Sequence, residues 1–302
     1  MTQVIINKNS GTVLRLGEDV VEELLRDHLK DAIDDVHFLP GADIAPYLKE
    51  LAADKSEEVL VGGGDGTAVT AAEIFAPAQV PFGILPLGTM NLLAQDLGAA
   101  PTFEQTMPRL GGLKRDVIDA GLVNGKMFLC SAVVGFVPEG AVAREALREN
   151  TGLATMANFI GTIARGMGGS IKQRLRLKSR HEDKPYPIET TSLIVSNNSF
   201  IQNPSDATQR FLRGTLTDGK LAVYSAAPRD IMDGLKMALS MWQGDWQDHE
   251  SIMSFEANEL IVETEEDTVL VSLDGEPQEM QSPLHFTIKT RSVPVLRMEL
   301  KE

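Results

Sequence analysis

The stretch from Val59 to Thr67 has the sequence VLVGGGDGT, and it decides the fold of the first part of the chain. A short apolar run enters a cluster of glycines that is interrupted only by Asp65, and an Ala-rich segment of helical character follows. Glycines allow a tight turn and allow a ligand to approach the backbone N–H groups closely. A helix that begins directly behind such a turn adds unpaired N–H donors and a dipole that favours anions. The stretch therefore predicts a phosphate-binding loop between a strand and a helix.

The carboxylate of Asp65 limits which ligands and reactions this loop can support. A carboxylate beside a phosphate chain would repel it, unless a Mg²⁺ ion bridges them or the carboxylate accepts a proton. No Gly-Lys-Ser/Thr sequence follows, so the loop is not a Walker A motif. The plainer alternative is a tight turn without a ligand, but four glycines in five positions exceed what one turn needs.

Strand-like and helix-like segments alternate over the first 98 residues. Short connections between such segments are typical of a parallel sheet that is covered by helices on both faces. Ligands of these sheets bind beyond the carboxyl ends of the strands. Three segments rich in Gly, Ser, Thr or Asn are predicted to lie there, at residues 7–11, 62–67 and 88–91.

The pattern changes near Asp116. The dipeptide Asn124-Gly125 separates two apolar runs, which is a strong signal for a hairpin with a type I′ turn. Strand-like runs dominate from there to the C-terminal end, and they predict a largely antiparallel β domain. Two predicted helices interrupt it, Leu153 to Met167 and Asp230 to Trp242.

Composition excludes several classes of function. The net charge of −15 argues against nucleic acid as a partner and against strong electrostatic attachment to anionic membranes. The single cysteine, Cys130, cannot form an internal disulfide, which suits the cytoplasm. No run of 18 apolar residues and no basic segment followed by an apolar one at the N-terminus is present. We therefore expect a cytoplasmic protein without a signal peptide or a membrane span.

At four stretches the sequence resembles the diacylglycerol kinase catalytic family, which includes bacterial soluble lipid kinases and sphingosine kinases. The four stretches are Ile5–Gly11, Gly63–Thr67, Pro86–Asn91 and Leu273–Glu276. Each is moderately specific alone, and their order and spacing together make the resemblance strong over nearly the whole chain.

The resemblance implies an α/β plus β architecture. Its N-terminal part would be a Rossmann-like, phosphofructokinase-like α/β nucleotide domain over residues 1–120, completed by the C-terminal segment 291–302. An antiparallel β-sandwich domain would occupy residues 121–290.

The resemblance also implies roles for particular residues. General base catalysis would fall to the acidic pair Asp274 and Glu276; we favour Glu276, with Asp274 and Asp65 as rivals. Taken alone, Asp274-Gly275 is equally typical of a simple turn between strands. A structural Mg²⁺ would be bound by Asp218 and the carbonyl of Lys220, where an ordinary Asp-Gly turn is the alternative. The implied ATP-binding residues are Asn7, Ser10, Gly11, Gly63, Gly64, Asp65, Gly66, Thr67, Gly88, Thr89 and Asn91.

The function that the resemblance implies is an ATP- and Mg²⁺-dependent lipid kinase of phospholipid biosynthesis, with diacylglycerol as the expected acceptor. Such an enzyme would be peripheral to the membrane, would touch its surface transiently and would be a homodimer by family expectation. The sequence Asn91-Leu92-Leu93 departs from the Asn-Asp that often stands there in the family. This departure leaves open a regulator that binds nucleotide or lipid without turnover. The Gly-Gly-Asp-Gly loop, which is related to that of NAD kinases, leaves open a phosphotransferase similar to those enzymes.

Overall fold

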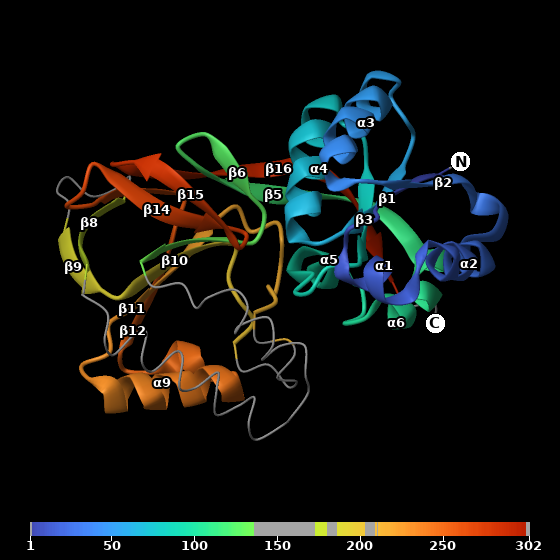
Figure 1. Cartoon of the computed structure of the whole chain (residues 1–302). Helices are drawn as coiled ribbons and strands as arrows, with labels where there is room; N and C mark the ends of the chain where they lie inside the picture. The colour runs from blue at the N-terminus through green and yellow to red at the C-terminus, as the bar shows by residue number, and fades with distance from the viewer. Residues whose placement is uncertain (1, 136–172, 180–185, 203–208, 210, 300–302) are drawn as a thin grey trace. The chain divides into compact units, whose positions relative to one another are not determined.

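A computed structural model describes residues 2–135, 173–179, 186–202, 209 and 211–299 (Figure 1). The predicted helix from Leu153 to Met167 lies outside these described residues. The chain divides into two compact units. Unit 1 comprises Met1–Ile118 and Arg291–Glu302, and unit 2 comprises Asp119–Thr290. The boundary at residue 118 lies two positions before the one expected at residue 120.

Unit 1 alternates strands with helices, as the sequence pattern predicts. Its strands are β1 (Thr2–Asn7), β2 (Ile33–Leu39), β3 (Val59–Gly63), β4 (Phe82–Pro86) and the first part of β5 (Leu113–Val123). Its helices are α1 (Gly11–Leu16), α2 (Glu18–Leu29), α3 (Gly41–Ala53), α4 (Asp65–Ala78), α5 (Leu92–Asp96) and α6 (Phe103–Thr106), with short 3-10 segments η1 (Lys30–Ala32) and η2 (Met107–Gly112).

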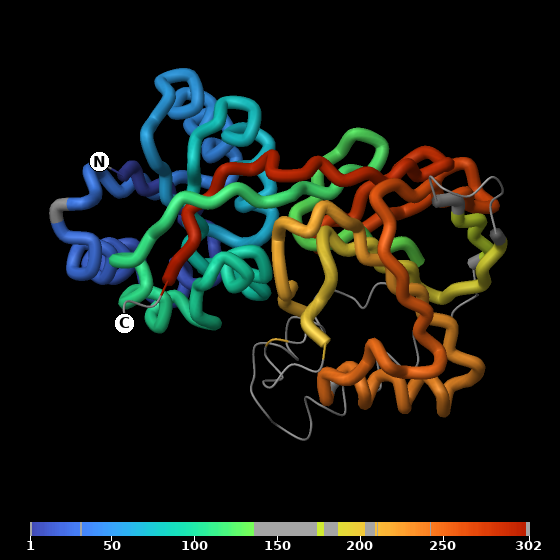
Figure 2. The backbone as a smooth tube through the Cα atoms, turned by 180° about the vertical axis from the view of Figure 1, so that it is seen from behind, coloured from blue at the N-terminus to red at the C-terminus, as the bar shows by residue number. Residues whose placement is uncertain are grey.

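The sheet of unit 1 has parallel strands in the order β2-β1-β3-β4, and the last part of β16 (Leu284–Met298) joins β4 in parallel through Val295 and Phe82. The strands β3 and β4 are buried along their whole lengths, which is why they are apolar without alternation. Helices α3 and α4 cover one face of the sheet, and α1, α2 and α6 cover the other (Figures 1 and 2).

Unit 2 is built from antiparallel strands in two layers. One layer has the order β12-β11-β10-β7-β14-β15, and the other contains β16-β13-β8-β9 with the hairpin of β5 and β6. The strands are β6 (Lys126–Phe128), β7 (Ser131–Gly135), β8 (Gln173–Ser179), β9 (Tyr186–Thr190), β10 (Ser192–Asn197), β11 (Leu221–Ala226), β12 (Ile252–Ala257), β13 (Glu259–Glu263), β14 (Thr268–Leu273) and β15 (Glu276–Gln281). The predicted turn at Asn124-Gly125 is confirmed, since both residues have positive φ values of 48° and 81°.

The core of unit 2 lies between its two layers. Leu193 and Val195 of β10 and Val271 of β14 pack against Leu175, Leu177 and Phe286 from the other layer, and all six are buried. The alternation of buried and exposed residues along β8 is the pattern expected for a strand with one face on such a core. A second cluster surrounds the buried Trp246 and includes Phe200, Phe211 and Tyr224.

One α-helix, α9 (Ile231–Gln243), lies in the described part of unit 2, followed by the 3-10 segment η4 (Trp246–Asp248). Asp230 caps α9, because its carboxylate accepts the N–H of Asp233 at 2.9 Å. In the described residues, no helix combines the length and the apolar character needed to cross a bilayer.

Candidate nucleotide-binding and catalytic residues

The three predicted loops of unit 1 meet at one edge of its sheet. The parallel register pairs Ile6 of β1 with Gly62 of β3, and Gly63 of β3 with Pro86 of β4. The carboxyl ends of these three strands are therefore neighbours, and the loops that leave them lie together. This edge is where α/β sheets of this kind bind their ligands.

The glycine loop, residues 62–67, leads directly into helix α4. Gly64 is the residue before the helix, and its carbonyl accepts the N–H groups of Thr67 at 3.0 Å and Ala68 at 3.1 Å. The first backbone N–H groups of any helix have no preceding helical turn to bond to, and α4 begins at Asp65. Gly63 must be glycine, since an added Cβ would lie 2.5 Å from the Thr67 hydroxyl oxygen. The loop thus presents backbone donors at a positive helix end, which suits a phosphate group.

The second loop, residues 86–91, is hydrogen-bonded to the glycine loop. The N–H groups of Leu87 and Gly88 both donate to the carbonyl of Gly63 at 3.1 Å. Asn91 has a left-handed backbone with a φ of 50° and closes this loop on itself. Its Oδ1 accepts the N–H of Gly88 at 2.8 Å, and its Nδ2 donates to the Gly88 carbonyl at 2.9 Å. The side chain of Asn91 therefore stabilises the loop, and α5 begins directly after it, at Leu92.

The N-terminal loop is similarly ordered by its own polar groups. Ser10 is buried, and its hydroxyl donates to the carbonyl of Asn7 at 2.8 Å. The side-chain oxygen of Asn7 accepts the N–H of Asn9 at 3.0 Å. The N–H of Thr12 donates to the carbonyl of Leu87 at 3.1 Å, which joins this loop to the second one. Gly11 opens α1 and is exposed, with nothing within 4 Å of the position of a Cβ.

The predicted ATP-binding residues of unit 1 are thus gathered on three neighbouring loops, with different exposure. Gly11, Gly66 and Thr89 are exposed, Asn7, Gly64, Asp65, Thr67 and Gly88 are half-buried, and Ser10, Gly63 and Asn91 are buried. Their individual contacts with a nucleotide stay predictions.

Asp65 occupies the first position of α4. Its Oδ1 accepts the N–H of Leu93 at 3.4 Å, which ties the start of α4 to the first turn of α5. A carboxylate at a helix N-terminus is stabilised by the dipole. The carboxylate of Asp65 therefore lies at the positive end of α4, beside the glycine loop.

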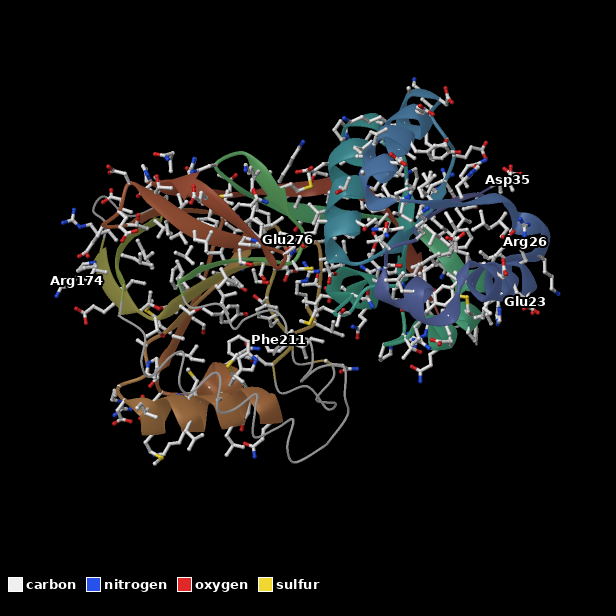
Figure 3. All side chains as sticks on the ribbon, in the orientation of Figure 1. Glu23, Arg26, Asp35, Arg174, Phe211 and Glu276 are labelled. Atoms are coloured by element: carbon white, nitrogen blue, oxygen red, sulfur yellow. The ribbon has the colours of Figure 1, made fainter. Side chains whose placement is uncertain are left out.

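The acids Asp274 and Glu276 lie in unit 2. Asp274 is on the turn that joins β14 to β15, and Glu276 is the first residue of β15 (labelled in Figure 3). Leu273 pairs with Glu276, and Asp274 and Gly275 form the two-residue turn with φ values of 47° and 92°. Positive φ at both positions is the type I′ geometry, which favours Asp-Gly. The turn alternative is thus confirmed in its geometry, and the two acids differ in their surroundings. Glu276 is exposed, whereas the carboxylate of Asp274 is turned onto backbone N–H groups.

Three consecutive residues donate to the Asp274 carboxylate. The N–H of Leu129 lies 2.7 Å from Oδ2, and the N–H groups of Cys130 and Ser131 each lie 2.8 Å from Oδ1. Burial raises the pKa of the Asp274 carboxyl above its ordinary value, and these donors together with the Arg213 guanidinium oppose the increase. Successive N–H groups of this kind form a backbone nest for an anion, and here the chain's own carboxylate fills it.

The predicted structural metal site at Asp218 and Lys220 has few oxygen donors. The carbonyl of Lys220 accepts the N–H of Asn198 at 3.0 Å, and the N–H of Asp218 donates to the side chain of Asn198 at 2.9 Å. The buried Asp119 accepts the N–H of Gly219 at 2.7 Å. These bonds are those of an anchored Asp-Gly turn. Within the described residues, no group of three or more His, Cys, Asp or Glu side chains could hold a metal, so water would have to supply most ligands of a Mg²⁺ ion here.

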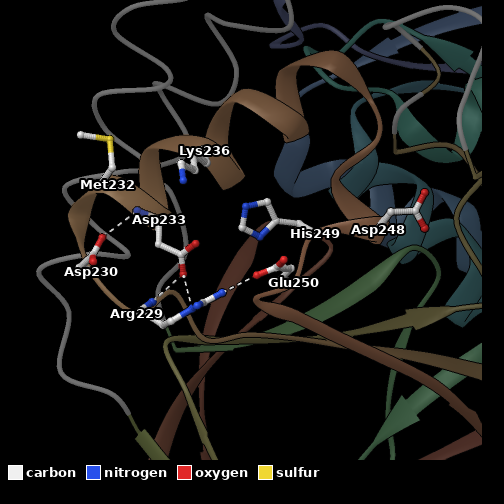
Figure 4. Close-up of a pocket in the computed structure, with 8 residues that line it drawn as sticks. All are labelled: Arg229, Asp230, Met232, Asp233, Lys236, Asp248, His249 and Glu250. Atoms are coloured by element: carbon white, nitrogen blue, oxygen red, sulfur yellow. Dashed lines mark hydrogen bonds and ion pairs between the residues drawn. The ribbon is translucent and has the colours of Figure 1, made fainter.

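Two features of unit 2 were not predicted from the sequence. The first is the buried Arg213, whose guanidinium donates to the carbonyl of Leu129, a residue whose N–H binds Asp274. The second is a polar cavity of about 540 Å³ beside the N-terminal half of α9 (Figure 4). Arg229 in this cavity pairs with Glu250 at 2.6 Å and with Asp233 at 3.7 Å. Both arrangements bring together residues that are far apart in sequence, so no local sequence pattern predicts them.

Comparison with known proteins agrees with this geometry. The family model described as "Diacylglycerol kinase catalytic domain" matches residues 2–123, which include all three loops. An uncharacterized protein of Synechocystis is 28% identical over 229 residues, which are 72% of this chain and 50% of that protein. A Pseudomonas fluorescens protein named "Probable lipid kinase YegS-like" is 38% identical over 98 residues, 32% of each chain. The chain thus spans half the length or less of these two relatives.

A solved structure has the same fold over nearly the whole chain. The crystal structure of a Bacillus anthracis protein, titled a "putative diacylglycerol kinase", superposes with a TM-score of 0.75 and 20% sequence identity. The superposition covers 98% of this chain and 96% of the other. An α/β unit with a parallel sheet and a second unit of antiparallel sheets are therefore common to both. Residues 2–123 of this chain, which carry the glycine loop and its two neighbouring loops, thus match the diacylglycerol kinase catalytic domain family.

Proposed function

We propose that this protein is an ATP- and Mg²⁺-dependent lipid kinase that phosphorylates a lipid hydroxyl, with diacylglycerol as the acceptor and phosphatidic acid as the product. The observation that carries the proposal is the meeting of three polar loops at the carboxyl edge of a parallel sheet, in a segment that matches a diacylglycerol kinase catalytic domain. Relatives named as lipid kinases support the same class of reaction.

The proposed roles follow from the chemistry of phosphoryl transfer, which depends on positioning and on charge stabilisation. The amides of the glycine loop and the N-terminus of α4 would bind the phosphates of ATP. A bound Mg²⁺ would neutralise phosphate charge, and Asp65 is the carboxylate on the loops of unit 1 that is suited to hold it. Glu276 would accept the proton of the lipid hydroxyl, because its carboxylate is exposed and free to approach a substrate.

The test is transfer of labelled phosphate from ATP to diacylglycerol in mixed micelles with Mg²⁺, followed by organic extraction and chromatography. Wild-type protein should yield labelled phosphatidic acid, and the Asp65→Asn variant should not. Parallel reactions contain sphingosine, monoacylglycerol or NAD in place of diacylglycerol. If label appears only in NAD, the protein is an NAD kinase and the proposal is wrong. If no acceptor is labelled, the alternative of a regulator that binds nucleotide or lipid without turnover is favoured.

A lipid kinase has to meet a bilayer, and we propose that helix α9 makes this contact. Its exposed apolar residues are Ile231 (61% exposed), Met232 (60%), Leu235 (39%) and Leu239 (41%). At about 100° per residue, these four side chains fall within an arc of roughly 100°. Gly234, Met237 and Ala238 on another side of the helix are buried.

An arc of this kind is the apolar face of an interfacial helix. The four side chains expose on the order of a few hundred Å², which marks an interaction surface. This is less than the roughly 800 Å² that each partner of a standard protein interface buries. A bilayer therefore fits this surface better than a second copy of the chain. Attachment would be transient and peripheral. The homodimer stays a separate prediction, which light scattering after size-exclusion chromatography tests.

A further inference from the structure

We propose that Asp274 is a positioning residue and not the proton acceptor: it fixes the turn that carries Glu276 by binding the backbone of residues 129–131. The proposal rests on the proposed kinase function for its catalytic consequence. It goes beyond that function, because it separates the roles of two acids that stand two positions apart. The carboxylate of Asp274 and the segment Leu129–Ser131 are called the 129–131 clamp below.

Lone-pair geometry is the first argument. A carboxylate has two oxygens with about two acceptor sites each. Oδ1 of Asp274 accepts hydrogen bonds from the N–H groups of Cys130 and Ser131, and Oδ2 accepts one from the N–H of Leu129. Three of about four acceptor sites are thus used within the protein. Burial raises the pKa of the Asp274 carboxyl, but protonation would weaken three short hydrogen bonds at once and release the turn, so a proton-accepting role in each catalytic cycle would conflict with holding the turn in place.

The second argument is that the same segment is held from its other side. The Leu129 carbonyl accepts hydrogen bonds from the guanidinium of the buried Arg213 and from Nδ2 of Asn197, the latter at 3.1 Å. The guanidinium of Arg213 also donates to the carbonyl of Asn197 at 3.2 Å. The N–H of Leu129 therefore donates to Asp274, and its carbonyl accepts from Arg213. The two side chains thus hold this backbone segment from two sides, and the burial of Arg213 is tolerated because its guanidinium is hydrogen-bonded.

The third argument is the position of the clamp on the turn. Asp274 is the first residue of the two-residue turn, and its own N–H donates to the carbonyl of Ser131 at 2.9 Å. Both its backbone and its side chain are therefore attached to residues 129–131. Glu276 is the first residue of β15, immediately after this turn. A shift of the turn moves the Glu276 carboxylate directly, and a displacement of about 1 Å in a catalytic group can cost about 10²-fold in rate.

The test compares Asp274→Asn, Glu276→Gln, the double variant and Gly275→Ala in the lipid kinase assay. Glu276→Gln should lower kcat by about 10²- to 10⁴-fold and remove the acidic limb of the kcat pH profile. Asp274→Asn places an NH₂ group against the donor N–H of Leu129, so it should lower kcat by up to about 10²-fold. The acidic limb should remain in this variant, because Glu276 still accepts the proton.

The double variant is the sharpest comparison. If Asp274 acts through Glu276, Asp274→Asn should cost nothing further once Glu276 is Gln. Gly275→Ala strains the turn at its φ of 92° and leaves both acids in place, so it should lower kcat while the limb of the pH profile remains. The proposal is overturned if Asp274→Asn removes the acidic limb, or if the two losses multiply in the double variant.

Amide hydrogen exchange provides a readout that needs no turnover. The N–H groups of Leu129, Cys130 and Ser131 should exchange faster in Asp274→Asn and at the wild-type rate in Glu276→Gln. Unchanged protection in Asp274→Asn would overturn the clamp. If wild-type protein shows no kinase activity, faster exchange in Asp274→Asn still upholds the 129–131 clamp, and only the proposed function fails. If Asp274→Asn does not fold, Gly275→Ala and the Glu276 variant carry the kinetic comparison.

Discussion

The backbones of Gly64 and Gly88 pack against one another so closely that a Cβ on Gly88 would lie 2.4 Å from the Cα of Gly64 and 3.1 Å from its nitrogen. Gly64 is the last residue of the glycine loop before helix α4, and Gly88 lies in the middle of the second loop. Two loops that are 24 positions apart in sequence (88 − 64) therefore act as one surface. The contact excludes a side chain at position 88.

Gly88→Ala should destabilise unit 1 for this reason. The clash is with backbone atoms that cannot rotate away, so we expect a loss of about 1–3 kcal/mol in the free energy of unfolding. Urea denaturation in the absence of nucleotide measures it. Gly11→Ala is the matched control, because nothing lies within 4 Å of its Cβ position and it stands at the start of a helix. Equal stability of the Gly88 and Gly11 variants would contradict the close packing of the two loops.

Asp65→Asn should separate binding from chemistry. Asn keeps an oxygen that can accept the N–H of Leu93, so the start of α4 should remain in place. The loss of negative charge should lower kcat by about 10²-fold or more while the affinity for ATP changes by only a few-fold. Calorimetry with ATP and the labelled-phosphate assay give the two values. A fall in ATP affinity as large as the fall in kcat would instead assign Asp65 to ground-state binding.

Charges on the exposed face of α9 should weaken contact with bilayers. Ile231→Asp and Leu235→Asp each place a carboxylate in the apolar arc, so co-sedimentation with phosphatidylcholine vesicles should fall and the KM for micellar lipid should rise. Turnover of a short-chain, water-soluble diacylglycerol should stay unchanged.

Leu270→Asp is the matched control for this surface. Leu270 is 60% exposed, similar to Ile231, but it lies on β14 and not on α9. Equal losses of vesicle binding in all three variants would assign the effect to net charge, and the contact through α9 would then be wrong.

Stability in acid should depend on Asp233. The Ser251 hydroxyl, which donates to Oδ2 at 2.6 Å, lowers the pKa of Asp233 below its ordinary value of 3.8, with the N–H of Arg229 as a further donor at 2.8 Å. The unfolded chain therefore binds more protons than the folded one between the two pKa values. The free energy of unfolding should decrease as the pH falls from about 4 through the folded pKa.

Denaturation with urea between pH 2.5 and 6 measures this dependence. Asp233→Asn should remove part of the slope below pH 4, and Ser251→Ala should reduce it. An unchanged slope in Asp233→Asn would show that other carboxylates carry the acid dependence.

Much of unit 1 follows from local sequence signals. The apolar run at β3, the glycines behind it and the alternation of strands with helices are sufficient to predict a parallel sheet with loops at one edge. The hairpin at Asn124-Gly125 also follows, because few residues other than Asn and Gly adopt positive φ without strain. In each case the residues that decide the structure are close together in the chain.

The roles of Asn91 and Asp274 could not be predicted in this way. A family resemblance assigns both to ligand or catalysis, whereas the structure gives each a set of backbone partners. Asp274 binds residues that are 143 to 145 positions away, and Arg213 is buried although an arginine in a sequence is typically a surface residue. Partners so distant in sequence have no local pattern, and only the folded chain brings them together.

Unit 1 is made from two segments, and this has a consequence for its biosynthesis. Residues 291–302 of unit 1 include the part of β16 that pairs with β4, while all of unit 2 lies before them in the chain. A ribosome releases the nucleotide-binding loops early but supplies the strand that pairs with β4 only after the remaining 172 residues, from Asp119 to Thr290, have been translated. At about 5–20 residues per second, this delay lasts on the order of ten seconds or more. During that time β4 has an open edge that could pair with other nascent chains, so maturation of the first unit is timed by synthesis of the second.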